Sequence, residues 1–165
     1  MSLPKYLLLG AAALFFGWLG VEIALRCTSL SPSLNTAPPQ SVEFVDRRGR
    51  PLRRFLQDQR VYRSRCKLSD ISLNVIAATL SAEDKRFRVH SGIDFLAAGR
   101  ALTQFLTKGA PQSGASTITE QLVKLGKHRE PRTITTKLAE VWWALCLERH
   151  WNKDQILEEY LNRLD

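Results

Sequence analysis

The stretch from Tyr6 to Leu25, near the start of the chain, is apolar except for Glu22. About 20 apolar residues are enough to cross a bilayer as an α-helix. A lysine precedes the run and a tryptophan lies near its far end, which favours a retained signal anchor with a cytoplasmic stub over residues 1–27. A cleaved signal peptide with its apolar part at Leu7–Leu19 is the alternative.

The pattern changes twice after the anchor. Prolines and serines dominate Thr28–Gln40, so we expect a linker over residues 28–41 and a folded domain over residues 42–165. Hydrophobic residues in Val42–Val45 and Leu52–Leu56 flank a turn-forming stretch and predict a short β-hairpin. Its arginines would keep an edge strand soluble or lie against lipid headgroups.

Two amphipathic helices are predicted between Leu68 and Thr107. Ser69 or Asp70 is the expected N-cap of the first helix, and Asp94 is the expected N-cap of the second. The residues expected on the apolar faces are Ile71, Val75, Ala78 and Ala82 in the first helix, and Phe95, Ala98, Leu102 and Phe105 or Leu106 in the second.

A glycine-containing loop and a capped helix are predicted over Lys108–Lys124. Thr117 and Glu120 have the spacing of a capping box. Free backbone N–H groups at such a helix start suit a phosphate, and Lys124 could add a positive charge about two turns on. An ordinary loop followed by a capped helix is the structural alternative.

Two further helices follow. Thr133–Leu147 carries an apolar stripe that we expect in the core, and Asn152 with Gln155 should cap a last helix over Lys153–Asn162. Lys137 and Glu140 lie three residues apart and form either a surface ion pair or a cation and a carboxylate that face a cleft. The stripe consists of Ile134, Leu138, Val141, Trp142 and Leu145.

Composition adds two constraints. Hydrophobic residues make up 44% of the 165 residues, and the formal net charge of +8 predicts an anionic partner: nucleic acid, anionic lipid or a phosphorylated substrate. The three cysteines have no metal-ligand spacing, and Cys146 is expected in the core. A disulfide between Cys27 and Cys66 stays open for a domain outside the cytoplasm.

The richest chemistry lies in the stretch Ser81–Asp94. Glu83 and Asp84 end an apolar helical run, and three cations, His90 and Gly92 follow. A carboxylate that accepts a proton beside an anionic substrate would suit this setting. A solvated charge cluster at a helix end, with a hydrogen-bonded loop histidine, is the alternative.

Four segments in order carry a resemblance to a known family: SAEDKRFRVHSGID, GASTITEQLVK, KLAE and KDQILEEYLN. Together they resemble glycosyltransferase family 51, the peptidoglycan glycosyltransferases of penicillin-binding proteins, over Val42 to the C-terminus. The segments VDRRGRPLRRFL and LERHWNKDQIL look most like the 1C branch of that family.

The resemblance implies a mainly α, lysozyme-like domain on the outer face of the cytoplasmic (inner) membrane, with a short N-terminal β-hairpin and one transmembrane helix before it. Such a domain would polymerise lipid II into β-1,4 glycan and release undecaprenyl pyrophosphate. It implies Glu83 as the catalytic base and Glu140 as a catalytic residue on the pyrophosphate side. The implied substrate-binding residues are Asp84, Phe87, His90, Gly114, Ser116, Thr117, Gln121, Lys124 and Lys137.

The implied partners are lipid II, the growing glycan chain, the membrane and other cell-wall synthesis proteins; the outward topology argues against nucleic acid. No protein-only metal site is expected, and an optional Mg²⁺ would be held through the substrate's pyrophosphate.

The chain departs from the family at three points. Glu120 stands where glutamine is usual, and Thr136 where many members have arginine. The family's domain continues beyond the YLN motif, so we expect a C-terminally incomplete domain. A membrane-anchored, non-catalytic binder of lipid-linked phosphate or cell-wall partners therefore stays an alternative, as does a lysozyme-type hydrolase.

Overall fold

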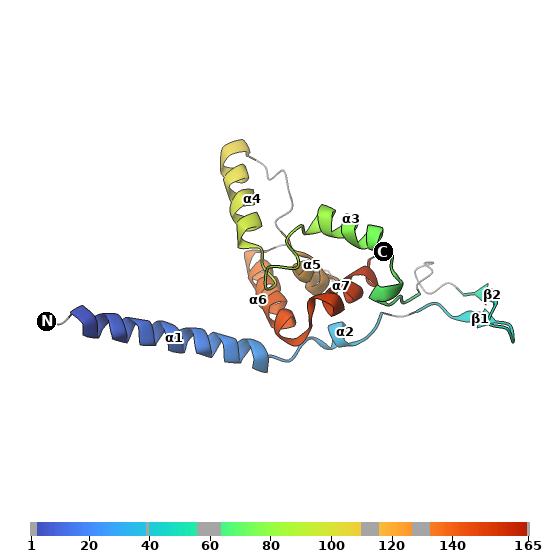
Figure 1. Ribbon diagram of the computed structural model, residues 1–165, viewed down its shortest axis with the longest axis horizontal. Helices are drawn as coiled ribbons and strands as arrows, with labels where there is room; N and C mark the ends of the chain where they lie inside the picture. Colours follow the sequence, from blue (N-terminus) through green and yellow to red (C-terminus); the bar gives the residue numbers. More distant parts are fainter. Residues whose placement is uncertain (1–2, 39, 56–63, 110–115, 127–132, 165) are drawn as a thin grey trace.

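The computed structural model describes residues 3–38, 40–55, 64–109, 116–126 and 133–164, with α-helices predominant (Figure 1). The helices are α1 (Leu3–Cys27), α2 (Pro32–Asn35), the 3₁₀ turn η1 (Leu68–Asp70), α3 (Leu73–Glu83), α4 (Phe95–Lys108), α5 (Ile118–Leu125), α6 (Ile134–His150) and α7 (Lys153–Leu161). Strands β1 (Glu43–Val45) and β2 (Pro51–Arg54) form an antiparallel hairpin. The predicted fold class, mainly α with a short hairpin after an apolar N-terminal helix, is confirmed.

Polar side chains at the helix starts set most of the boundaries. Asp94 accepts a hydrogen bond from the backbone N–H of Ala97 and caps α4, as expected. Asn152 and Gln155 form a complete capping box at the start of α7. The predicted caps of α3 are wrong: Ser72 caps this helix, because Leu68–Asp70 closes first into the separate turn η1.

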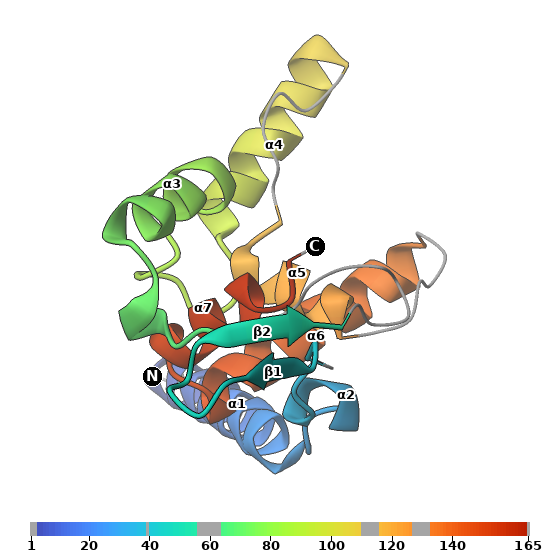
Figure 2. The same ribbon diagram turned by 90° about the vertical axis from the view of Figure 1, so that its right-hand side faces the viewer.

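Helix α5 lies at the centre of the core, packed against α6 and α7 (Figure 2). Its apolar side chains meet residues from the linker, the loop after α3, and both of these helices. The buried cluster consists of Leu34, Phe87, Ile118, Leu122, Val123, Ala144, Leu147, Ile156, Leu157 and Tyr160. Leu34 shows that the predicted linker takes part in this core: a Cβ atom placed on Gly126 would lie 2.6 Å from the Leu34 Cδ2 atom.

The predicted apolar faces are mostly not in the core. Ile134 at the start of α6 is 83% exposed, and α4 points away from the packed helices (Figure 1). In α3, Ile76 and Leu80 pack against the core in place of the expected face. The exposed residues of the predicted faces include Val75, Phe95, Leu102, Phe105, Leu106, Leu138 and Trp142. Periodicity identifies an apolar face but not the element that covers it.

Helix α6 buries a different stripe from the predicted one. Ala144, Cys146 and Leu147 are fully buried near its C-terminal end. The expectation that Cys146 belongs to the core is therefore confirmed. Cys27 and Cys66 are both free and exposed, so the disulfide that the sequence left open is not formed.

The N-terminal helix carries the candidate membrane span. Tyr6–Cys27 comprises 22 residues and includes an 18-residue stretch with a mean hydropathy of 1.9, so it is long and apolar enough to cross a membrane by length and composition. The end of α1 packs against α6 (Figure 1). There Leu25 is buried, and the Glu22 carboxylate accepts hydrogen bonds from Arg149 Nε at 2.9 Å and 3.1 Å.

The hairpin turn is held by one carboxylate. Asp46 Oδ1 accepts the backbone N–H groups of Arg48 and Arg50 at 2.8 Å and 2.9 Å. Gly49 has a φ of 76°, which glycine adopts without steric strain. Both strands are exposed along their length, so the hairpin stands apart from the core.

Candidate active site

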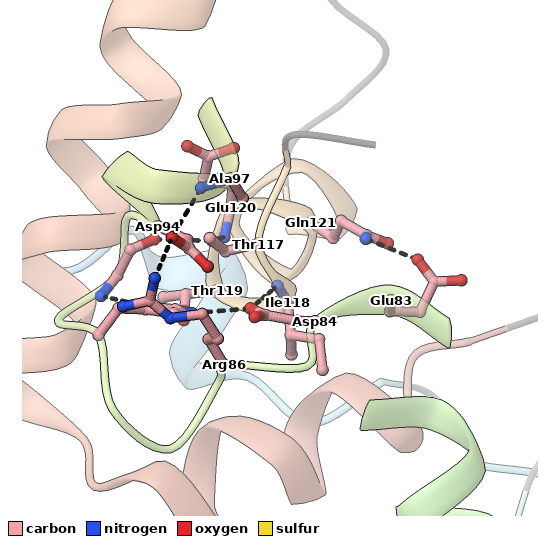
Figure 3. A network of polar contacts seen from close by, with 12 residues as sticks. Glu83, Asp84, Arg86, Asp94, Ala97, Thr117, Ile118, Thr119, Glu120 and Gln121 are labelled. Carbon is pink, nitrogen blue, oxygen red and sulfur yellow. Dashed lines mark hydrogen bonds and ion pairs between the residues drawn. The ribbon is translucent and has the colours of Figure 1, made fainter. Parts of the chain in front are cut away.

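A hydrogen-bonded line runs from the core to an exposed carboxylate at the end of α3. The buried Tyr160 hydroxyl donates to Gln121 Oε1 at 3.0 Å. The Gln121 Nε2 atom in turn donates to Glu83 Oε2 at 2.9 Å (Figure 3). Glu83 is the last residue of α3 and its side chain is exposed, so it is held in place while it stays accessible.

The next residue anchors the chain beneath this carboxylate. Asp84 is buried, and its Oδ2 atom accepts the backbone N–H of Ile118 at 3.1 Å (Figure 3). The same oxygen lies 2.9 Å from His90 Nε2. The backbone N–H of Gly92 donates to His90 Nδ1, so in the neutral ring the proton is on Nε2 and is donated to Asp84. The backbone beside Glu83 is thereby fixed to the start of α5.

Gly92 lies in the loop between α3 and α4, where its backbone comes close to α6. Its φ is 97°, and a Cβ atom at this position would lie 2.9 Å from the Ala144 carbonyl oxygen. The Thr117 hydroxyl donates to the Gly92 carbonyl oxygen at 2.7 Å. Both the backbone conformation and the available space therefore require glycine here.

A second polar cluster surrounds the ammonium group of Lys137 on α6. Lys137 Nζ lies 2.7 Å from Glu120 Oε2, 3.2 Å from Ser116 Oγ and 3.4 Å from Glu140 Oε2. Glu120 is buried, whereas the Lys137 side chain is 48% exposed. Because Glu120 and Gln121 are consecutive residues of α5, this helix contributes to both clusters.

Glu120 therefore completes only half of the predicted capping box. Thr117 caps α5 by accepting the backbone N–H of Glu120, as expected. The Glu120 side chain turns to Lys137 instead of back to the cap. In this position the buried carboxylate has a partner of opposite charge at 2.7 Å, which a backbone N–H group would not provide.

The structure brings most of the predicted site residues into these two groups. Glu83 contacts Gln121, and the ammonium group of Lys137 contacts Ser116 and Glu140. Four others lie buried beneath the site, and Lys124 is exposed on the turn of α5 that follows Gln121. The buried four are Asp84, Phe87, His90 and Thr117. Gly114 lies outside the described residues, and the substrate contacts assigned to these residues stay predictions.

Structural carboxylates neutralise two of the cations that follow Glu83. Arg86 lies 3.6 Å from Asp94, and Arg88 pairs with Asp154. Burial raises the pKa of Asp94, but the hydrogen bond from Ala97 and the positive charge of Arg86 outweigh it, so that pKa lies below its usual value.

Sequence reasoning did not identify Tyr160 as part of this site. In the sequence it continues the apolar pattern of α7 and resembles a core residue. The one available signal is that a buried phenol hydroxyl usually requires a hydrogen-bond partner. Burial and the nearby Glu83 carboxylate both raise the pKa of Tyr160.

Comparison with known proteins places these residues in a family. A family model described as Transglycosylase matches residues 48–165. Similar proteins include penicillin-binding protein 1A/1B of Bacillus subtilis (strain 168), 36% identical over 137 residues, which are 81% of this chain and 15% of that protein. Penicillin-binding protein 1C of Escherichia coli (strain K12) is 37% identical over 115 residues, 70% of this chain and 15% of that protein.

A third relative, penicillin-binding protein 1A of Pseudomonas aeruginosa, is 40% identical over 102 residues, which are 62% of this chain. The chain spans 12% of the length of this relative and 15% of the other two. The likeness is therefore to one part of much longer proteins.

Proposed function

The chain belongs to the transglycosylase family, and from this premise we propose that it is a peptidoglycan glycosyltransferase that polymerises lipid II. The arrangement of Glu83 carries the proposal: an exposed carboxylate is held by Gln121, and the next residue of α5 contacts the Lys137 cluster. The transfer of a sugar from a lipid pyrophosphate requires a base and a cation, and two consecutive residues of α5 contact one of each.

Glu83 is the proposed general base. It takes the proton from the 4-hydroxyl of the acceptor sugar as that oxygen attacks the anomeric carbon of the donor. The bond from the anomeric carbon to the pyrophosphate oxygen breaks with inversion, and undecaprenyl pyrophosphate leaves with the electron pair. Because pyrophosphate is already a good leaving group, no second carboxyl group has to protonate it, unlike in a glycosidase.

Lys137, Ser116 and Glu140 form the proposed pyrophosphate side. The Lys137 ammonium balances the charge that develops on the leaving group, and the Ser116 hydroxyl offers a hydrogen bond. Glu140 holds the lysine from the same helix at 3.4 Å. Lys124, exposed one turn after Gln121, adds a positive charge on the Gln121 side of α5.

A divalent cation is an optional part of the proposal. In the described parts of the chain, no group of three or more His, Cys, Asp or Glu side chains is placed to hold a metal ion. Mg²⁺ would therefore be bound mainly through the oxygens of the substrate's pyrophosphate, since this ion readily shares its coordination with phosphate groups.

We also propose that α1 anchors the chain in the inner membrane with the domain on the periplasmic face. The end of the candidate span packs against α6, and this contact would keep the site close to lipid-linked substrate in the same membrane. The growing glycan chain and other cell-wall synthesis proteins are the partners that this location would bring within reach.

Product analysis tests the reaction type. The full chain, reconstituted in vesicles with lipid II, should give glycan longer than one disaccharide together with released undecaprenyl pyrophosphate. Free disaccharide formed by attack of water would identify a hydrolase instead. Bound lipid with no product would identify a binding protein, and either result would refute the proposal.

A further inference from the structure

We propose that Tyr160 is a positioning residue for Glu83: by donating to Gln121 it fixes the polarity of the glutamine amide, which then presents its NH₂ group to the carboxylate. The inference rests on the proposed function, because it deepens the role of Glu83 as a base. In this role Tyr160 acts through Gln121, to which its hydroxyl donates, and not directly on Glu83.

The argument starts from the two ends of an amide. A glutamine side chain has a donor end and an acceptor end of nearly the same shape, so packing alone does not select one orientation. With NH₂ toward Glu83, the amide donates to an ionised carboxylate at 2.9 Å. With the orientation reversed, the carbonyl oxygen would face the carboxylate oxygen, and the ionised form that a base requires would lose its donor.

Tyr160 selects between the two orientations. Its hydroxyl lies 3.0 Å from Gln121 Oε1 and gains a full hydrogen bond by donating to this oxygen. Tyr160 is 2% exposed, and its ring packs within the main core cluster, so the hydroxyl cannot turn away to water. In the reversed orientation the Gln121 NH₂ group would face the Tyr160 hydroxyl. The hydroxyl proton would then lose its acceptor, and an unpaired buried donor is destabilising.

Neighbouring contacts fix the relative positions of Tyr160, Gln121 and Glu83, whose two hydrogen bonds form the proposed relay. Asp84 binds the start of α5 through the N–H of Ile118, so the backbone beside Glu83 and the backbone that carries Gln121 move together. Tyr160 comes from α7, which packs against α5. The orientation of the carboxylate thus depends on three helices that share one core.

A phenylalanine variant separates positioning from packing. Tyr160→Phe keeps the ring and removes the hydroxyl. In the full chain in vesicles, this variant should lower kcat for lipid II polymerisation about five- to tenfold, the equivalent of one lost hydrogen bond, with little change in KM. Thr119→Val is the matched control, because it also removes the hydroxyl of a buried residue. The Thr119 hydroxyl donates to Glu148 and takes no part in the hydrogen bonds that connect Tyr160, Gln121 and Glu83. The kcat of this control should equal that of the parent.

A double-mutant cycle with Gln121→Ala tests the relay itself. If Tyr160 acts through Gln121, Tyr160→Phe should cost nothing further once Gln121 is gone, so the double variant should match Gln121→Ala. Unchanged kcat in Tyr160→Phe would overturn the proposal. So would a double variant whose loss equals the product of the two single losses.

An activity-independent measurement distinguishes failure of the relay from failure of the proposed function. If the parent does not polymerise lipid II, the proposed function fails. The hydrogen bonds of Gln121 can still be tested through its side-chain NH₂ signals in the nuclear magnetic resonance spectrum. Tyr160→Phe and Glu83→Gln should each shift these signals, and Thr119→Val should not. Signals that stay in place in both variants would refute the relay.

Discussion

At the scale of single residues, the Lys137 ammonium group already has a full set of partners. Its three N–H groups face Glu120, Ser116 and Glu140 at 2.7 Å, 3.2 Å and 3.4 Å. A pyrophosphate that binds here has to replace one of these contacts, and the buried Glu120 carboxylate holds the lysine most closely. Glu120 should therefore restrain the affinity of the site for anionic ligands.

Glu120→Gln should strengthen the binding of undecaprenyl pyrophosphate to vesicles that contain the full chain. Removal of one carboxylate frees the lysine and takes a negative charge away from the phosphates, so we expect about a tenfold lower Kd at low salt. The gain should shrink as salt is added.

Glu148→Gln is the control for this prediction. It also removes a carboxylate that pairs with a lysine at 2.7 Å, but this pair, with Lys153, lies at the other end of α6. Its Kd should match that of the parent. An unchanged or higher Kd in Glu120→Gln would contradict the assignment of Lys137 to the pyrophosphate.

At the scale of elements, caps were easier to predict than buried faces. Asp94, Thr117 and Asn152 cap their helices as the sequence indicates, because a cap depends on a side chain and the three residues after it. The apolar stripes of α4 and α6 were also visible, but their burial depends on neighbours far away in the chain. Ile134 and Phe105 are consequently exposed although they follow helical spacing.

Asp94→Ala tests the capping of α4. The cap is worth about 0.5–2 kcal/mol, so the amides of α4 should exchange with solvent several times faster than in the parent at neutral pH. Because the pKa of Asp94 lies below its usual 3.8 in the folded state, its contribution is complete above that value. It should disappear as the pH falls through the lowered pKa.

Hydrogen exchange, corrected for the intrinsic rate at each pH, measures this effect. Thr103→Ala serves as the control, since it lies within α4 and its hydroxyl donates to the backbone carbonyl oxygen of Arg100. Exchange rates that are equal in Asp94→Ala and the parent at neutral pH would rule out the cap as a determinant of α4.

At the scale of the whole molecule, the ion pair between Glu22 and Arg149 joins the candidate anchor to the domain. Glu22 interrupts the apolar run of α1, and its two carboxylate oxygens accept hydrogen bonds from Nε and Nη2 of Arg149. The sequence indicates a charge in the anchor but not its partner, because 127 residues separate the two. The same holds for Glu83 and Gln121, which the resemblance names and only the fold brings together.

Arg149→Ala should loosen the domain from the anchor. The variant removes the hydrogen bonds and the positive charge that Arg149 offers to Glu22, and in the described parts of the chain Arg26 remains as its ion-pair partner. The exposed thiols of Cys27, at the end of α1, and Cys66, tied to α7 through Asn162, can carry spin labels. Their distance distribution should broaden in this variant.

Arg50→Ala is a suitable comparison, because it removes a similar arginine–carboxylate pair from the distant hairpin turn. Its distance distribution should match that of the parent. A distribution that stays narrow in Arg149→Ala would show that the apolar contacts of Leu25 hold the anchor without the ion pair.

The most direct test of the central claim, that Glu83 is the base, compares the parent with Glu83→Gln at saturating lipid II. Glutamine keeps the size of the side chain but cannot take a proton, so kcat should fall by about 100-fold or more while lipid binding stays measurable. Glu43→Gln, the same change at a hairpin carboxylate paired with Arg54, should polymerise at the parent's rate. Glycan synthesis by Glu83→Gln at the parent's rate would contradict the account.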